Sequence, residues 1–184
     1  MDISYLPSVK KQFEYYKFLG DKTFIQLNND QFFELPNKNN NSIAIVVKHI
    51  AGNMRSRWTE FLTEDGEKEW RNRDSEFINS FTTKEEVIAY WEIGWKTLFD
   101  ALHTITDENF KTIIYIRNEG HSITEAINRQ LCHYSYHIGQ IVLLSKLLLG
   151  NDWQTLSVAK GASKMYNEEK FNKTKSRKHF TEDL

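Results

Sequence analysis

The sequence predicts an all-α protein, most simply a four-helix bundle. Four long segments repeat apolar residues at helical spacing. The 184 residues include only two prolines and eight glycines, so few strong helix breakers interrupt these segments. Aromatic residues make up 14% of the chain and supply large side chains for a core between the helices. These observations favour helices over a strand-and-turn architecture.

The first predicted helix spans about residues 4–27, and the second spans about residues 43–62. Ser42 precedes the second apolar run and is the expected N-cap, because a serine hydroxyl accepts a hydrogen bond from a free N–H of the first turn. A loop around Pro36 separates the two helices. The inner face of the first helix is formed by residues three or four apart, namely Leu6, Val9, Phe13, Tyr16 and Leu19.

Two capping boxes mark the starts of the remaining helices. After a polar loop over residues 63–80, Thr82 and Glu85 form the first box and begin a helix that ends near His103. Ser122 and Glu125 form the second box, and this helix continues to residue 149 and stops at Gly150. Between these helices, the β-branched and aromatic segment 110–116 predicts a short extended excursion, followed by a turn over 117–120. Beyond residue 150 we expect an irregular tail.

Composition and charge exclude several classes of function. With 24 basic and 25 acidic residues the net charge is −1, so no overall field attracts nucleic acid or an anionic membrane. No apolar run approaches the roughly 18–20 residues that cross a bilayer, and no signal sequence is apparent. Cys132 is the only cysteine, which fits a reducing compartment. We therefore expect a cytoplasmic protein with one domain.

His133 and His137 are the first candidate metal ligands. They lie four residues apart in the fourth predicted helix, so both imidazoles face one side, with Cβ atoms roughly 5–6 Å apart. Two imidazoles placed in this way can bind one metal ion. The alternative is that both are hydrogen-bonded packing residues at a helix interface, and the pair alone does not decide between the two. We expect this fourth helix to be central, because it is apolar nearly all round.

His49, on the second predicted helix, supplies a third nitrogen ligand if the second and fourth helices are neighbours. Three nitrogen ligands with one open position are the arrangement of a catalytic transition-metal site. Asn53 and Arg57 follow His49 at one-turn intervals, and we expect them to line a pocket and orient an anionic or polar substrate. Their alternative role is hydrogen bonding between helices.

Other reactive residues give weaker signals. Cys132 is next to His133, but adjacent helical side chains point apart, so we expect buried packing rather than a Cys–His nucleophilic pair. The alternating run 71–76 can bind an anionic group, although a solvated or self-paired loop is commoner. The remaining histidines are His103 at a helix end, His121 beside a turn and His179 in the basic tail.

Two segments carry a resemblance to a known family. They are residues 47–53, Val-Lys-His-Ile-Ala-Gly-Asn, and residues 128–140, Asn-Arg-Gln-Leu-Cys-His-Tyr-Ser-Tyr-His-Ile-Gly-Gln. With these segments the chain resembles the DinB-like superfamily, and within it the YfiT-like group of metal-dependent enzymes. The loop 65–74 is similar to that of a particular bacterial branch. The resemblance spans most of residues 1–160 and departs from the branch pattern at Ala159, where a proline is usual.

The resemblance implies an up-up-down-down four-helix bundle over residues 1–160, followed by a polar, basic tail over residues 161–184. It implies a divalent metal such as Zn, Ni or Fe, bound by a histidine on helix two and a His-x-x-x-His pair on helix four. His49, His133 and His137 occupy those positions. Characterised members include thiol S-transferases that use small thiols such as bacillithiol or mycothiol, and dimers are common among them.

We therefore expect a metal-dependent enzyme, either a hydrolase or a thiol S-transferase, in which the ion activates water or a small thiol. The expected partners are a small-molecule substrate, such as a low-molecular-weight thiol, and a second copy of the chain in a homodimer. A non-catalytic metal- or small-molecule-binding bundle in stress response is the alternative class. The sequence identifies no general base.

Overall fold

The fold is mostly helical, with one small antiparallel sheet. The structure is a computed structural model and describes residues 5–182. Within that range the α-helices are α1 (Tyr5–Ile25), α2 (Asn29–Phe33), α3 (Ile43–Trp58), α4 (Lys84–His103), α5 (Ile123–Leu149) and α6 (Ser163–Phe171). The strands are β1 (Ile113–Ile116) and β2 (Glu119–Ser122), and the 3-10 turns are η1 (Asp74–Phe77) and η2 (Gly150–Asp152).

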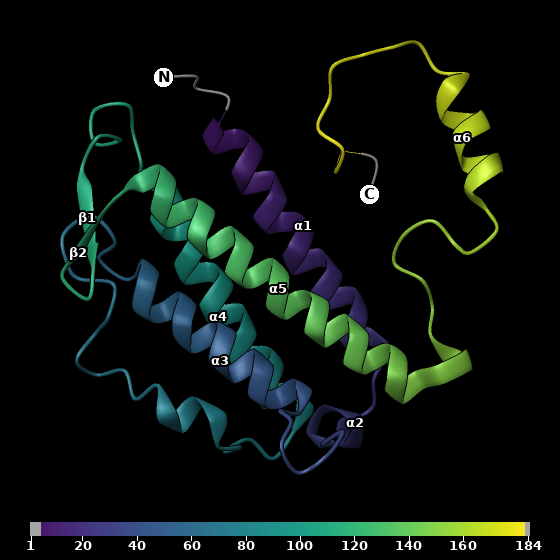
Figure 1. Cartoon of the computed structure of the whole chain (residues 1–184), viewed down its shortest axis with the longest axis horizontal. Helices are drawn as coiled ribbons and strands as arrows, with labels where there is room; N and C mark the ends of the chain where they lie inside the picture. The colour runs from purple at the N-terminus through teal and green to yellow at the C-terminus, as the bar shows by residue number, and fades with distance from the viewer. Residues whose placement is uncertain (1–4, 183–184) are drawn as a thin grey trace.

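The four long helices lie side by side, with the hairpin at one end of them (Figure 1). Helix α1 contacts α4 and α5, and helix α3 contacts the same two helices. The approach of α3 to α4 is close, since a Cβ on Gly94 would lie 2.8 Å from the Cα of Ala51. Helix α3 also contacts α5, so these two helices are neighbours, as a three-histidine site requires.

An aromatic core joins the long helices. The ring of Phe13 on α1 lies 6.4 Å from those of Trp58 on α3 and Trp95 on α4, and 6.0 Å from that of Tyr134 on α5. Trp58 Nε1 donates a 3.0 Å hydrogen bond to the Tyr134 hydroxyl, which satisfies a buried polar group in this core. The packing fixes how α3 and α5 face each other.

Several predicted helix ends are confirmed. Ser42 caps α3 by accepting a 3.3 Å hydrogen bond from the Ile45 N–H. Ser122 and Glu125 form the predicted capping box of α5. This helix ends at Gly150, whose φ of 55° lies in the left-handed region that favours glycine. Helix α3 stops four residues before the predicted end, because the chain turns at Glu60 with a φ of 47°.

The predicted capping box of α4 is wrong by one residue. Thr83 is the N-cap, and its partner is Glu86, rather than Thr82 with Glu85. The sequence places two threonines directly before Lys84 and two glutamates after it, so both registers satisfy the motif. The Glu86 carboxylate also accepts a 2.7 Å hydrogen bond from the Thr82 N–H, which favours the observed register.

The sequence analysis did not predict helix α2 or strand β2. Helix α2 is only five residues long and begins with a capping box between Asn28 and Gln31. The extended excursion is confirmed as β1, but it pairs with a second strand, β2. The turn between them places Arg117 and Asn118 at φ values of 56° and 61°, the geometry of a tight hairpin turn.

Helix α5 is not buried on every side, contrary to the expectation of a central helix. Leu143 and Leu147 are 58% and 70% exposed, so one face of the helix meets solvent. Cys132 lies on the exposed side, and the expected buried packing of this residue is wrong. His133 and His137 are partly buried on another side of the helix.

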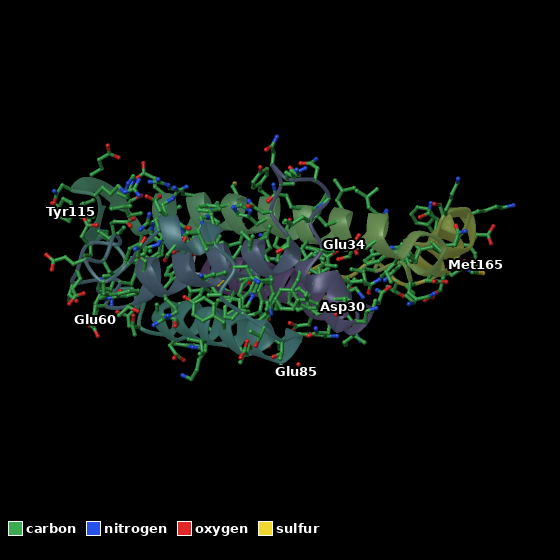
Figure 2. All side chains as sticks on the ribbon, turned by 90° about the horizontal axis from the view of Figure 1, so that it is seen from below. Asp30, Glu34, Glu60, Glu85, Tyr115 and Met165 are labelled. Atoms are coloured by element: carbon green, nitrogen blue, oxygen red, sulfur yellow. The ribbon has the colours of Figure 1, made fainter. Side chains whose placement is uncertain are left out.

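The C-terminal tail is not irregular throughout, contrary to the expectation, because it contains helix α6. None of its residues is buried, and Figure 2 shows Met165 of α6 and Tyr115 of the hairpin at opposite ends of the molecule. The chain then returns to α1, where the ring of Phe180 lies 5.2 Å from that of Tyr15. None of the described helices has the length and apolar character needed to cross a membrane.

Candidate metal centre

Three histidines converge between helices α3 and α5. The Nε2 atoms of His133 and His137 are 3.0 Å apart, and those of His49 and His133 are 3.4 Å apart. The candidate ligand atoms of all three residues lie within 4.8 Å of one another. The structure thus brings together the three predicted ligands, and no fourth His, Cys, Asp or Glu joins them within residues 5–182.

These separations fit a divalent metal ion. Bonds of about 2.0–2.1 Å to imidazole nitrogen place two ligands roughly 3.3–3.4 Å apart at a tetrahedral angle, and about 2.8–3.0 Å apart at a right angle. The two observed Nε2 distances, 3.0 and 3.4 Å, span this range. One proton can serve a single pair of nitrogens, whereas a cation satisfies three converging lone pairs at once. The residues present therefore fit a divalent ion.

Hydrogen bonds on the outer nitrogens orient two of the rings. His49 Nδ1 lies 2.9 Å from a carboxylate oxygen of Glu76, and His137 Nδ1 lies 2.7 Å from the amide oxygen of Gln140. Both partners are acceptors, so each Nδ1 carries the proton and donates it. The lone pair then remains on Nε2, the atom that faces the other histidines.

Glu76 is itself held in place. It is 5% exposed, and Arg71 donates hydrogen bonds of 2.8 and 3.0 Å to its two oxygens. Gly52 on α3 makes this approach possible, because a Cβ on that residue would lie 2.5 Å from Glu76 Oε1. The predicted self-pairing of the run 71–76 therefore occurs, and it supports His49.

Burial and neighbouring cations favour the neutral imidazoles. Burial lowers the pKa of His133 to about 3, and His137, His49, Arg57 and Arg71 add to this effect. Burial also lowers the pKa of His137, although its hydrogen bond with Gln140 opposes the shift. Neutral imidazole is the form that binds metals, so the local field prepares both rings for this role.

A cavity of about 240 Å³ adjoins the histidines, and His49 and His133 form part of its wall. Arginines from several elements line the rest, together with two amides. The lining residues other than the histidines are Asn53, Arg57, Arg71, Arg73, Arg117, Arg129 and Gln130. The cavity gives a small molecule access to the position where the three imidazoles meet.

Asn53 and Arg57 line this cavity, as predicted, and they also make contacts between elements. Asn53 accepts a 3.0 Å hydrogen bond from the Tyr134 hydroxyl of α5, which is the alternative interhelical role. Arg57 donates to the Gly66 carbonyl and to Glu67, the latter at 3.0 Å. Contact with a substrate stays a prediction for both residues.

Sequence reasoning missed the residues that surround the histidines. Gln140 lies one turn after His137, and that spacing was a usable signal. Glu76, Arg117 and Arg129 carried no comparable signal, because they come from separate parts of the chain. The other three histidines, His103, His121 and His179, lie outside the cluster.

A comparison with known protein families gives a match over most of the chain. Residues 1–162 match the family described as "Protein of unknown function (DUF1572)". The chain belongs to the DUF1572 family. No curated protein and no solved structure matches this DUF1572 chain. Its function therefore has to be inferred from the histidine cluster and the cavity beside it.

Proposed function

We propose that this DUF1572 chain is a metal-dependent enzyme of the DinB-like, YfiT-like type, in which His49, His133 and His137 hold a divalent ion such as Zn, Ni or Fe. The observation that carries the proposal is the convergence of three Nε2 atoms beside a cavity whose wall includes His49 and His133. Three protein ligands leave a position for a water or a substrate, whereas structural zinc sites have four.

The reaction class is hydrolysis or thiol S-transfer on a small molecule. A divalent cation supplies Lewis acidity, which lowers the pKa of a coordinating water or thiol towards neutrality. Glu76 and Gln140 fix the proton of their histidine partners on Nδ1, and Asn53 and Arg57 line the space for the substrate. Both oxygens of Glu76 are already hydrogen-bonded, so we assign this residue to positioning rather than to proton transfer.

We also propose that the long helices form the up-up-down-down bundle of DinB-like proteins. In support, α1, α5, α3 and α4 contact one another in a closed ring. We propose that this unit comprises residues 1–160, that 161–184 form a separate tail, and that the protein is a homodimer. The family match, which ends at residue 162, agrees with this boundary.

Elemental analysis of protein purified without an affinity tag or chelator tests the proposal. We expect close to one equivalent of Zn, Ni or Fe in the wild type, little in His133→Ala, and a wild-type content in the control His103→Ala. His103 ends α4 and is outside the cluster. A metal-loaded wild type is then assayed for thiol transfer and ester hydrolysis.

Two outcomes contradict the proposal. If the wild type contains no metal and takes up none of the three ions, the histidines are packing residues. In the second outcome, the protein binds metal, unfolds when the metal is removed, and exchanges no small molecule at the site. The protein is then a non-catalytic metal-binding bundle.

A further inference from the structure

Arginine is concentrated in the cavity beside the histidines. The chain has seven arginines, and five of them line this cavity: Arg57, Arg71, Arg73, Arg117 and Arg129. None of the seventeen lysines does so. The whole chain has a net charge of only −1, so this clustering is local and is not a consequence of a basic protein.

The five arginines come from four separate parts of the fold. Arg57 is on α3, Arg71 and Arg73 are in the loop after α3, Arg117 is in the hairpin turn, and Arg129 is on α5. Asp65 joins the loop to the hairpin, since its carboxylate accepts 2.8 Å hydrogen bonds from the N–H groups of residues 117 and 118. Tertiary structure, rather than a basic run of sequence, creates the cluster.

Only part of this positive charge is neutralised. Glu67 pairs with Arg57, Arg71 and Arg117 at 3.0–3.3 Å, and Glu76 pairs with Arg71. Two carboxylates against five guanidinium groups leave a charge of about +3. Among the described residues no carboxylate pairs with Arg73 or Arg129: Arg73 lies over the Phe77 ring, and Arg129 lies 3.5 Å from His121.

The predominance of arginine over lysine in the cavity favours a ligand with an oxyanion group. A guanidinium presents a planar fork of donors that matches a carboxylate or phosphate with two parallel hydrogen bonds, whereas a lysine offers a point charge. The cavity wall also contains Gln130, which is 3% exposed and whose amide oxygen has no hydrogen-bond partner. A buried acceptor of this kind is expected to meet a donor, such as a ligand hydroxyl or amide.

We propose that the substrate held beside the three histidines is a small molecule with a carboxylate or phosphate group, which Arg73, Arg129 and Arg117 bind while Gln130 accepts a hydrogen bond from a neutral donor. This inference rests on the proposed function, because it assigns the anion to the substrate of the metal centre. A cavity of about 240 Å³ is smaller than drug-sized pockets, which begin at roughly 300 Å³, and suits a small metabolite.

Titration calorimetry with three probes tests the anion site: succinate, inorganic phosphate and the neutral succinamide. Each is titrated into chelator-treated protein and into protein loaded with Zn. We expect at least one of the two anions to bind both forms, and succinamide to bind at least tenfold more weakly. We also expect the affinity to fall as salt is added, because exposed arginines contribute to it.

The decisive variant is the double substitution Arg73→Gln, Arg129→Gln. Both side chains are exposed and form no ion pair with a carboxylate among residues 5–182, so the fold should persist, and circular dichroism checks this. The control Lys146→Gln, Arg177→Gln removes the same charge at exposed positions outside the cavity. Affinity should fall by roughly tenfold or more for each arginine that contacts the anion, and should stay within about threefold in the control.

The outcomes separate this inference from the proposed function. If neither anion binds at millimolar concentration, or if the arginine variant and the control bind alike, the inference is wrong. If the anions bind only with metal present and the arginine variant has no effect, they are metal ligands, and the inference fails while the metal centre stands. If anion binding depends on the arginines but no metal binds, the anion site stands and the metal-dependent function fails.

Discussion

Gly52 is the residue through which the outer hydrogen bonds of the candidate metal centre can be tested most cleanly. In Gly52→Ala, the new Cβ would lie 2.5 Å from Glu76 Oε1 and 2.9 Å from its carboxyl carbon. Ordinary van der Waals contact begins near 3.4 Å, so the carboxylate has to move by roughly 0.9 Å. Oε1 and Oε2 belong to one rigid carboxylate, so we expect the shift to displace Oε2 as well and to weaken its 2.9 Å hydrogen bond with His49 Nδ1.

Loss of such an outer hydrogen bond typically weakens metal binding by about 10–100-fold, or roughly 1.4–2.8 kcal/mol. We expect this range for Gly52→Ala. The stability of the metal-free fold should change less, because alanine favours a helix over glycine by about 1 kcal/mol and partly offsets the clash. A large loss of metal affinity with a small change in fold stability would therefore identify the displaced Glu76 carboxylate as the cause.

The assay is a competition titration of metal-free protein against a chromophoric chelator with Zn or Ni, combined with urea unfolding of the metal-free form. Gly139→Ala is a matched control, because this glycine is also helical, lies two residues from His137, and a Cβ there meets nothing within 4 Å. The control should bind metal with wild-type affinity, and its free energy of unfolding should rise by about 0.5–1 kcal/mol. Metal affinity in Gly52→Ala within about threefold of the wild type would refute the role assigned to Glu76.

Three further results are expected. Burial lowers the pKa of His133 to about 3, so below pH 6.5 the unfolded chain binds a proton that the folded chain does not; the stability of the metal-free protein should fall as pH decreases from 6.5 to 5, and His133→Gln should flatten that slope. Tyr134→Phe leaves the buried Trp58 Nε1 without its acceptor and should lower the free energy of unfolding by about 1–3 kcal/mol, while a loss below about 0.5 kcal/mol would contradict this reasoning. Asp65→Ala removes the acceptor of the N–H groups of residues 117 and 118 in the hairpin turn, and should speed their hydrogen exchange at least tenfold without unfolding the helices. An unchanged exchange rate would show that Asp65 does not stabilise the turn.

The parts of the site that sequence predicted are those fixed by local periodicity. The spacing of His133 and His137 determines that they share a helix face, and the serine caps of α3 and α5 act within one turn. His49 could be joined to the pair only through a family resemblance. Its 3.4 Å approach to His133 depends on how α3 packs against α5.

The rest depends on contacts between distant segments. Glu76 reaches His49 across twenty-seven residues, and Arg117 reaches Glu67 through the hairpin turn. The short helices α2 and α6 were missed because five and nine residues carry too little periodic pattern. Adjacent threonines made the register of the α4 cap ambiguous, so a local rule failed where two positions satisfied it equally well.

The arginines and the histidines act on each other through the same electric field. Arg57 and Arg71 help to lower the pKa of His133, in keeping with a positive potential that extends from them to the histidine cluster. A positive potential opposes both a protonated imidazole and a metal cation, and Glu76 and Glu67 offset only part of it. It also stabilises a carboxylate, a phosphate or a thiolate in the cavity. Removing the charge of Arg73 and Arg129, which hold neither Glu67 nor Glu76, should therefore tighten metal binding slightly while weakening anion binding strongly. Opposite changes of this kind are expected of a site that gives up some metal affinity in order to bind and activate an anion.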